Sequence, residues 1–226
     1  MSLFEEHKAE RRARIMAAAK KLVVKHGYQG LTMRDLAAAA RVSVPTLYNL
    51  FGSKDAILLA ELEAIAGSIA QALPITGESF MQRGMAAFDT GMAILEASPA
   101  FFRAVIQMFL TSPETDRVRD RVQQGFVSIM EANLRNAQAV DQLVEWAEPA
   151  IIARHMFAQH MAGFLAWGLG QVDFATFRTG TMSGCAHLLV GVARGPFRDE
   201  LEAQIRSLRG VLNTLIEEDS HVAVRR

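Results

Sequence analysis

The chain has 226 residues, of which 50% are hydrophobic and 21% charged, so it can bury a substantial core and is too apolar to be disordered. Its net charge is zero, but residues 1–54 hold ten Lys and Arg against four Asp and Glu, a net charge of +6, and the remainder carries −6. This asymmetry argues against an evenly neutral surface and indicates a polyanionic partner for the N-terminal segment.

Cysteine content and hydropathy bear on the compartment. Cys185 is the only cysteine, so an intramolecular disulfide is impossible and a reducing cytoplasm is expected. The N-terminal residues MSLFEEHKAERR are charged and lack the apolar core of a signal peptide. The longest nearly apolar run, residues 156–172, is interrupted by Gln159 and His160 and is too short and glycine-rich to span a membrane. We therefore expect a soluble, cytoplasmic protein.

Residues 5–26 predict an amphipathic helix that ends at Gly27. Its apolar residues recur at helical spacing: Ile15, Ala18, Ala19, Leu22 and Val23. Its basic residues are Arg11, Arg12 and Arg14. They are placed either to follow a phosphate backbone or to form a solvated charged face, and the pattern leaves both interpretations open.

Residues 31–54, LTMRDLAAAARVSVPTLYNLFGSK, predict two short helices joined by a tight turn. Thr32 is a candidate N-cap with Asp35 completing a capping box, and Ser43 is a second N-cap that precedes Pro45 in a first turn. A helix-turn-helix places its second helix in the DNA major groove.

The spacing within residues 44–51 predicts which side chains reach a duplex. The inward set is Leu47, Leu50 and Phe51, and the outward set is Pro45, Thr46, Tyr48 and Asn49. The outward groups suit phosphates and base edges. Ser53 caps a third helix, and Lys54 at its N-terminus predicts an anion site for a DNA phosphate.

This stretch resembles the N-terminal DNA-binding domain of the TetR family of bacterial transcriptional regulators. The matching residues are Gly30-Leu31-Thr32, Arg34-Asp35-Leu36-Ala37, Val42-Ser43, Thr46-Leu47-Tyr48, Phe51, Ser53-Lys54 and Ile57-Leu58. The resemblance assigns phosphate contacts to Thr32, Thr46, Tyr48 and Lys54. It assigns base-edge contacts to Arg34, Val44, Pro45 and Asn49. Family members usually carry glycine where Arg41 turns the chain; a left-handed arginine costs about 1 kcal/mol and is tolerable.

The remaining pattern predicts an all-α fold with two domains, residues 1–53 for DNA binding and residues 54–226 for ligand binding and dimerisation. The expected helices are 54–73, 78–97, 100–111, 114–140, 142 or 149 to 168, 174–194 and 197–218. We expect helix 54–73 to be the only link between the two domains and hence a lever.

Helices 149–168 and 174–194 are apolar almost all round, so one chain covers them only partly. We expect two copies to pack them into an intersubunit four-helix bundle, a homodimer that the TetR resemblance also implies.

The acidic domain is rich in methionine and phenylalanine, which at helical spacing are mostly core but also suit an apolar ligand. The predicted lining residues are Met85, Phe88, Phe126, Met130, Trp146, His155 and Gln159.

Enzyme chemistry is disfavoured. Cys185 and His187 are two apart on a helix and cannot meet as nucleophile and base. His155 and His160 lack the i, i+4 spacing of helical metal ligands. We predict no catalytic site, no metal and no cofactor.

The sequence thus predicts a homodimeric, ligand-responsive repressor that a small apolar or amphipathic molecule releases from a palindromic operator in double-stranded DNA. The alternative is a ligand-independent dimeric regulator or activator with the same DNA-binding domain. A membrane-associated or enzymatic helical bundle is the more remote alternative, and salt-dependent binding to duplex DNA separates it from both.

Overall fold

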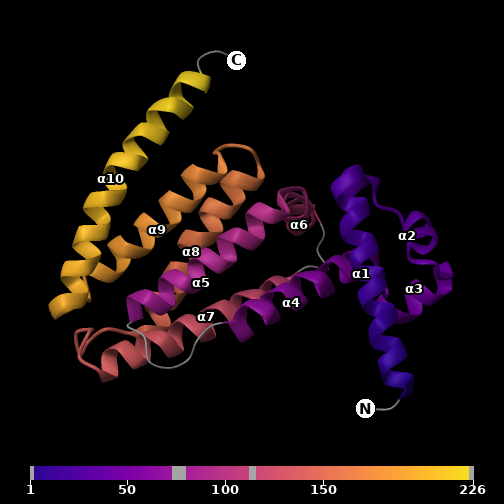
Figure 1. Cartoon of the computed structure of the whole chain (residues 1–226), viewed down its shortest axis with the longest axis horizontal. Helices are drawn as coiled ribbons and strands as arrows, with labels where there is room; N and C mark the ends of the chain where they lie inside the picture. The colour runs from indigo at the N-terminus through magenta and orange to yellow at the C-terminus, as the bar shows by residue number, and fades with distance from the viewer. Residues whose placement is uncertain (1–2, 73–79, 112–115, 224–226) are drawn as a thin grey trace. The chain divides into compact units, whose positions relative to one another are not determined.

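The computed structural model describes residues 3–72, 80–111 and 116–223, and within them the chain forms ten α-helices (Figure 1). The helices are α1 (Leu3–Gly30), α2 (Met33–Ala40), α3 (Val44–Phe51), α4 (Lys54–Ala72), α5 (Phe80–Ala97), α6 (Pro99–Thr111), α7 (Asp116–Ala139), α8 (Pro149–Gly168), α9 (Phe174–Val190) and α10 (Gly195–Ala223). The predicted all-α fold is confirmed. The predicted helix ends at Leu73, Glu78 and Glu114 lie outside the described residues.

Helix α10 runs Gly195–Ala223 rather than over the predicted 197–218. Two further boundaries differ from the prediction for identifiable reasons. Helix α1 continues past Gly27, but Gly27 has φ 71° and ψ 175°, so the predicted end survives as a kink. Helix α9 ends at Val190 rather than at residue 194, because the next residues pair with the segment before α8. The amide of Val144 donates to the carbonyl of Val192 at 2.9 Å. This backbone pairing is long-range and left no pattern in the sequence.

The chain forms two compact units that cut across chain order. The first unit comprises Met1–Ala72 and Ala93–Val122, and the second comprises Leu73–Met92 and Gln123–Arg226. Helix α6 therefore belongs with α1 to α4, and it packs against α1. The expectation that helix 54–73 alone links the DNA-binding segment to the rest is corrected, since α6 provides a second contact. The division after residue 53 stays a prediction about function.

The first unit is built on α1. Helices α2, α4 and α6 all pack against α1, and α3 packs against α2 and α4. Fully buried side chains include Ile15 and Ala19 on α1, Leu36 on α2 and Leu47 on α3. The alanines of α2 leave little side-chain bulk, which allows close helix crossing as predicted.

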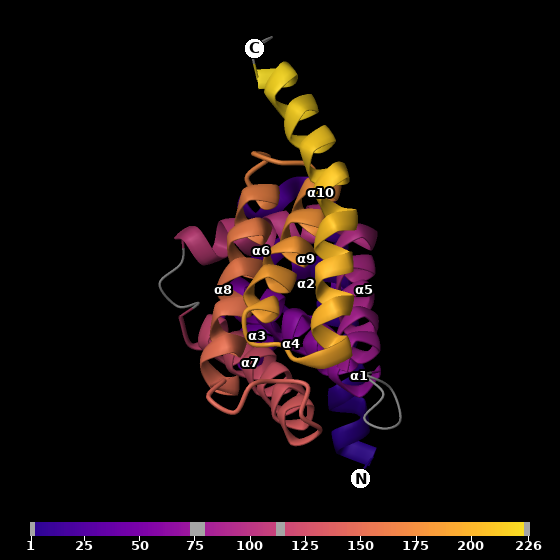
Figure 2. The ribbon, with the colours of Figure 1, turned by 90° about the vertical axis from the view of Figure 1, so that its left-hand side faces the viewer.

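The second unit has a continuous core shared by α7, α8, α9 and α10. Its largest buried members include Leu134, Leu143, Phe157, Phe197 and Leu201. Helix α9 packs between α8 and α10, and the three run side by side in Figure 2.

Within the described residues, no single helix is long and apolar enough to cross a membrane; one bent pair, Gly84–Ala97 with Pro99–Thr111, passes that test only jointly.

Candidate nucleic-acid interface

Local hydrogen bonds fix the turn between α2 and α3. The Thr32 hydroxyl accepts from the Asp35 amide at 3.1 Å and donates to the Asp35 carboxylate at 2.7 Å. Asp35 thus closes the capping box through the hydroxyl rather than through the Thr32 backbone. Arg41 is left-handed at φ 53°, as predicted, and its amide reaches the last turn of α2. Ser43 accepts from the Thr46 amide at 3.2 Å and starts α3.

Helix α3 presents one polar, exposed side. Leu47 is completely buried and Leu50 is partly buried, whereas Tyr48 is 53% exposed and Asn49 and Pro45 are exposed. The exposed part of the Tyr48 side chain is accessible to a ligand. The predicted division of α3 holds for buried Leu47 and for exposed Pro45, Tyr48 and Asn49. Thr46, predicted to face outward, is half-buried like Leu50 and Phe51.

The other predicted contact residues surround this side. Thr32 and Arg34 are exposed on the first turn of α2, and Val44 and Thr46 are partly exposed on α3. The Thr46 hydroxyl lies 2.7 Å from the Ser43 hydroxyl. A hydroxyl that supports a cap can still form one more hydrogen bond. The phosphate contact of Thr46 therefore stays a prediction.

Two arginines of α1 have structural partners that the sequence did not indicate. Arg12 donates to the carbonyl of Leu50 at 2.7 Å, and its guanidinium lies 4.1 Å from the Phe51 ring centroid. Arg14 donates to the carbonyl of Ala40 at 3.0 Å. Both cations meet helix C-termini, where unpaired carbonyls and the helix dipole favour positive charge. These bonds hold α2 and α3 on α1. They disfavour the interpretation that Arg12 and Arg14 follow a DNA phosphate backbone.

Lys54 also has partners within the chain. Its ammonium lies 3.4 Å from the carbonyl oxygens of Tyr28 and Leu31 and 4.4 Å from the Tyr28 ring centroid. The Tyr28 hydroxyl in turn donates to Asp55 at 2.8 Å. The predicted phosphate contact of Lys54 stays a prediction beside this structural role.

The residues predicted to line a ligand pocket occupy different environments. Met85 accepts a hydrogen bond from Gln204 of α10 at 3.3 Å, and Phe88 is half-buried on α5. Phe126 and Met130 pack against the core of the second unit. Trp146 is 71% exposed and His155 is exposed, so neither reaches the interior of a single chain.

Gln159 lies against Gly184, where an added Cβ would come within 2.5 Å of its amide carbon. Its neighbour His160 stands among aromatic rings, with ring centroids of Phe126, Phe164 and Phe177 at 5.8, 6.2 and 5.6 Å. Burial lowers the pKa of His160 to about 4, so the imidazole is neutral at neutral pH. This aromatic cluster was missed, because its members come from three helices and only packing brings them together.

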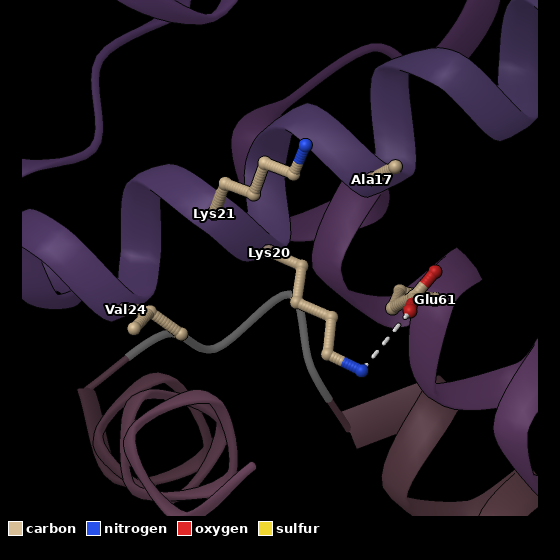
Figure 3. A pocket seen from close by; sticks show the side chains of 5 residues that line it. All are labelled: Ala17, Lys20, Lys21, Val24 and Glu61. Carbon is tan, nitrogen blue, oxygen red and sulfur yellow. Dashed lines mark ion pairs between the residues drawn. The ribbon is translucent and has the colours of Figure 1, made fainter.

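An open surface hollow lies between α1 and α4 (Figure 3). The hollow has a volume of about 450 Å³. Its lining residues are Ala17, Lys20, Lys21, Val24 and Glu61. Lys20 points across it to Glu61, with 3.8 Å between the charged atoms. This hollow lies outside the predicted ligand-binding residues.

A profile described as bacterial regulatory proteins of the tetR family matches residues 15–60, which run from α1 into the start of α4. The chain is 38% identical over 65 residues to HbdR, an HTH-type transcriptional regulator of Aromatoleum sp., covering 29% of this chain and 28% of HbdR. It is 31% identical over 110 residues to FasR, an HTH-type transcriptional activator of Mycolicibacterium smegmatis, covering 46% and 50%. The matches thus span half or less of these relatives.

Solved structures extend the similarity of fold to most of the chain. SmeT, the repressor of the Stenotrophomonas maltophilia multidrug efflux pump SmeDEF, superposes with a TM-score of 0.67 at 20% identity and covers 82% of this chain and 92% of SmeT. A TetR-family regulator from Syntrophomonas wolfei superposes with a TM-score of 0.67 at 17% identity, covering 80% and 96%.

Proposed function

The chain belongs, through residues 15–60, to the TetR family of bacterial regulatory proteins, and from this premise we propose that it is a homodimeric DNA-binding transcriptional regulator. The protein acts in the bacterial cytoplasm on a palindromic operator, with one α3 in each of two successive major grooves. The observation that carries the proposal is the exposed polar side of α3, which presents Tyr48 and Asn49 to solvent.

The contacts divide by chemistry. Thr32, Thr46, Tyr48 and Lys54 serve the phosphates, and Arg34, Val44, Pro45 and Asn49 serve the base edges. Asparagine pairs in a bidentate manner with adenine, whereas a phenol or hydroxyl at a phosphate carries no sequence information. Because Arg12 and Arg14 hold α2 and α3 in place, the recognition surface is prepared before DNA arrives.

The homodimer forms through α8 and α9. Ile151 on α8 is 52% exposed and Leu188 on α9 is 37% exposed, large apolar groups that a partner would cover. Gly163 and Gly184 already let α8 and α9 approach closely within one chain, which gives a compact helical hairpin for a second copy to pack against.

Regulation is a population shift. A small apolar or amphipathic effector bound among the helices of residues 54–226 favours a conformation in which the two α3 helices no longer match grooves about 34–36 Å apart. By linkage, operator DNA weakens effector binding by the same factor. In this mechanism the protein represses transcription until the effector releases it from the operator. SmeT, described as a repressor, supports repression rather than activation.

The second candidate is a ligand-independent regulator or an activator with the same DNA-binding segment. Phe126 and Met130 pack against the buried core of the second unit, and this packing favours a structural role for the helical part. FasR is named a transcriptional activator, so the relatives that match this sequence include an activator.

Selection of duplexes from a random-sequence pool by the wild-type protein, followed by titration at several salt concentrations, tests the proposal. The logarithm of the affinity must fall linearly with the logarithm of salt concentration. Tyr48→Ala should weaken binding to selected and random duplexes alike. Asn49→Ala should relax preference at one base pair per half-site by about 1–3 kcal/mol.

Arg135→Ala, which removes a cation of the second unit paired with Glu131, is the matched control and should leave both affinities unchanged. Equal effects of Tyr48→Ala and Asn49→Ala on specific and random DNA would refute the contact assignment. An effector that binds but leaves DNA affinity unchanged would remove the switch and keep the DNA-binding proposal.

A further inference from the structure

The end of α1 turns back onto the first turn of α4. Gly27, with φ 71° and ψ 175°, adopts a backbone conformation essentially reserved for glycine, and the next residue, Tyr28, is 6% exposed. The Tyr28 hydroxyl donates to Asp55 at 2.8 Å, and Asp55 is only 8% exposed. A buried hydroxyl-to-carboxylate bond is short, strong and directional.

Lys54 contacts the same tyrosine. Its ammonium contacts the Tyr28 ring face and the carbonyl oxygens of Tyr28 and Leu31. The first two residues of α4 are therefore both anchored to the kinked end of α1. We name this arrangement of Tyr28, Lys54 and Asp55 the α1–α4 clamp.

The clamp lies next to the recognition helix in the chain. Only Gly52 and Ser53 separate α3 from α4, and Ser53 caps α4 through the Ala56 amide at 3.1 Å. The C-terminal end of α3 is held to α1 through Arg12 and Leu50. Helix α1 thus contacts the end of α3 before Gly52 and the start of α4 after Ser53. The angle between α3 and α4 therefore depends on the clamp.

We propose that Tyr28 is a positioning residue for DNA binding, which acts through Asp55 and Lys54 to fix α4 relative to α3 and never touches DNA itself. The inference rests on the proposed function. Side chains that read base edges must be held within about half an ångström, and a supporting hydrogen bond supplies that precision where apolar packing alone does not. Phenylalanine at position 28 keeps the buried ring and removes the hydroxyl that bonds Asp55.

The test compares duplexes selected by the wild-type protein with random-sequence duplexes, well below the melting temperature of every variant. Tyr28→Phe should bind the selected duplex about tenfold more weakly, with the salt slope unchanged because no phosphate contact is lost. Amide hydrogens of residues 57–60 should exchange faster in this variant without DNA. Asp55→Asn, which keeps an acceptor, should stay within about threefold of wild type.

Asp55→Ala should weaken binding at least as much as Tyr28→Phe, and the double variant should lose less than the sum of the two single losses, because both substitutions remove the Tyr28–Asp55 bond. The control Asp173→Ala loses the cap of α9 and should melt earlier with DNA affinity unchanged. If Tyr28→Phe binds the selected duplex like wild type, with or without faster exchange, the positioning role is wrong. If wild type binds no duplex, the proposed function fails and the inference fails with it.

Discussion

The helix-turn-helix segment and the α8–α9 hairpin are held by different kinds of interaction. In the former, side-chain caps at Thr32, Ser43 and Ser53 bond amides three residues on. In the latter, ring clusters and glycine contacts join residues such as Gly163 and Phe177 on neighbouring helices. Local caps set where the short helices of the helix-turn-helix begin, whereas contacts between helices dominate in the hairpin, beside the local cap at Asp173. Substitutions should therefore act differently in the two regions.

The largest effect is expected at the closest helix approach. A Cβ at Gly163 would lie 2.7 Å from the Phe177 ring, which is 2% exposed and cannot yield. Gly163→Ala should lower the free energy of unfolding by about 3 kcal/mol, measured by urea denaturation at fixed protein concentration. Gly125→Ala at an exposed position of α7, with nothing within 4 Å, should raise the free energy of unfolding by up to about 1 kcal/mol. Similar losses at both positions would contradict the packing argument.

The aromatic cluster should make stability depend on pH. The pKa of His160 is lowered to about 4 in the folded chain, so between pH 6.5 and 4 the unfolded chain binds the extra proton and stability falls as pH falls. Acidification from pH 7 to 5 should cost about 2 kcal/mol through this group. His160→Phe should flatten that part of the profile. An unchanged slope in the variant would show that other groups cause it.

The smallest expected effects are losses of folding stability when a helix cap is removed. These losses should be equal in the two regions, because a helix cap is a local interaction. Ser43 caps α3 and Asp173 caps α9 by accepting the amides of Thr46 and Thr176. Substitution of either by alanine should cost about 1 kcal/mol of stability. Only Ser43→Ala should also weaken binding to a selected duplex, in a gel-shift or anisotropy titration. Loss of DNA affinity in both variants would mean that the two regions are not separable in this way.

The same contrast explains how far sequence reasoning reached. Caps, Pro45 and the spacing of Leu47 carry their meaning within a few residues, so α2, α3 and the exposure of Tyr48 and Asn49 could be predicted. The similarity of residues 15–60 to one regulatory family supports the same assignment.

Features that depend on long-range packing could not be read from the sequence. Arg12 and Leu50 are 38 residues apart, and Tyr28 and Asp55 are 27 apart, so nothing local indicates that they bond. For the same reason the prediction of a pocket lining rests on composition alone, and the structure places Trp146 at the surface. Hydrophobic spacing identifies a helix without telling which neighbour its apolar side meets.

The packing of α6 on α1 has a practical consequence for anyone who wishes to isolate the DNA-binding part. Phe101 is fully buried, and Lys20 of α1 stands over its ring at 5.5 Å. A fragment cut after residue 53 or 72 would lose this cover and leave an apolar stripe of α1 in water, where it invites aggregation. Truncated fragments should therefore aggregate, and operator searches are best carried out with the intact polypeptide.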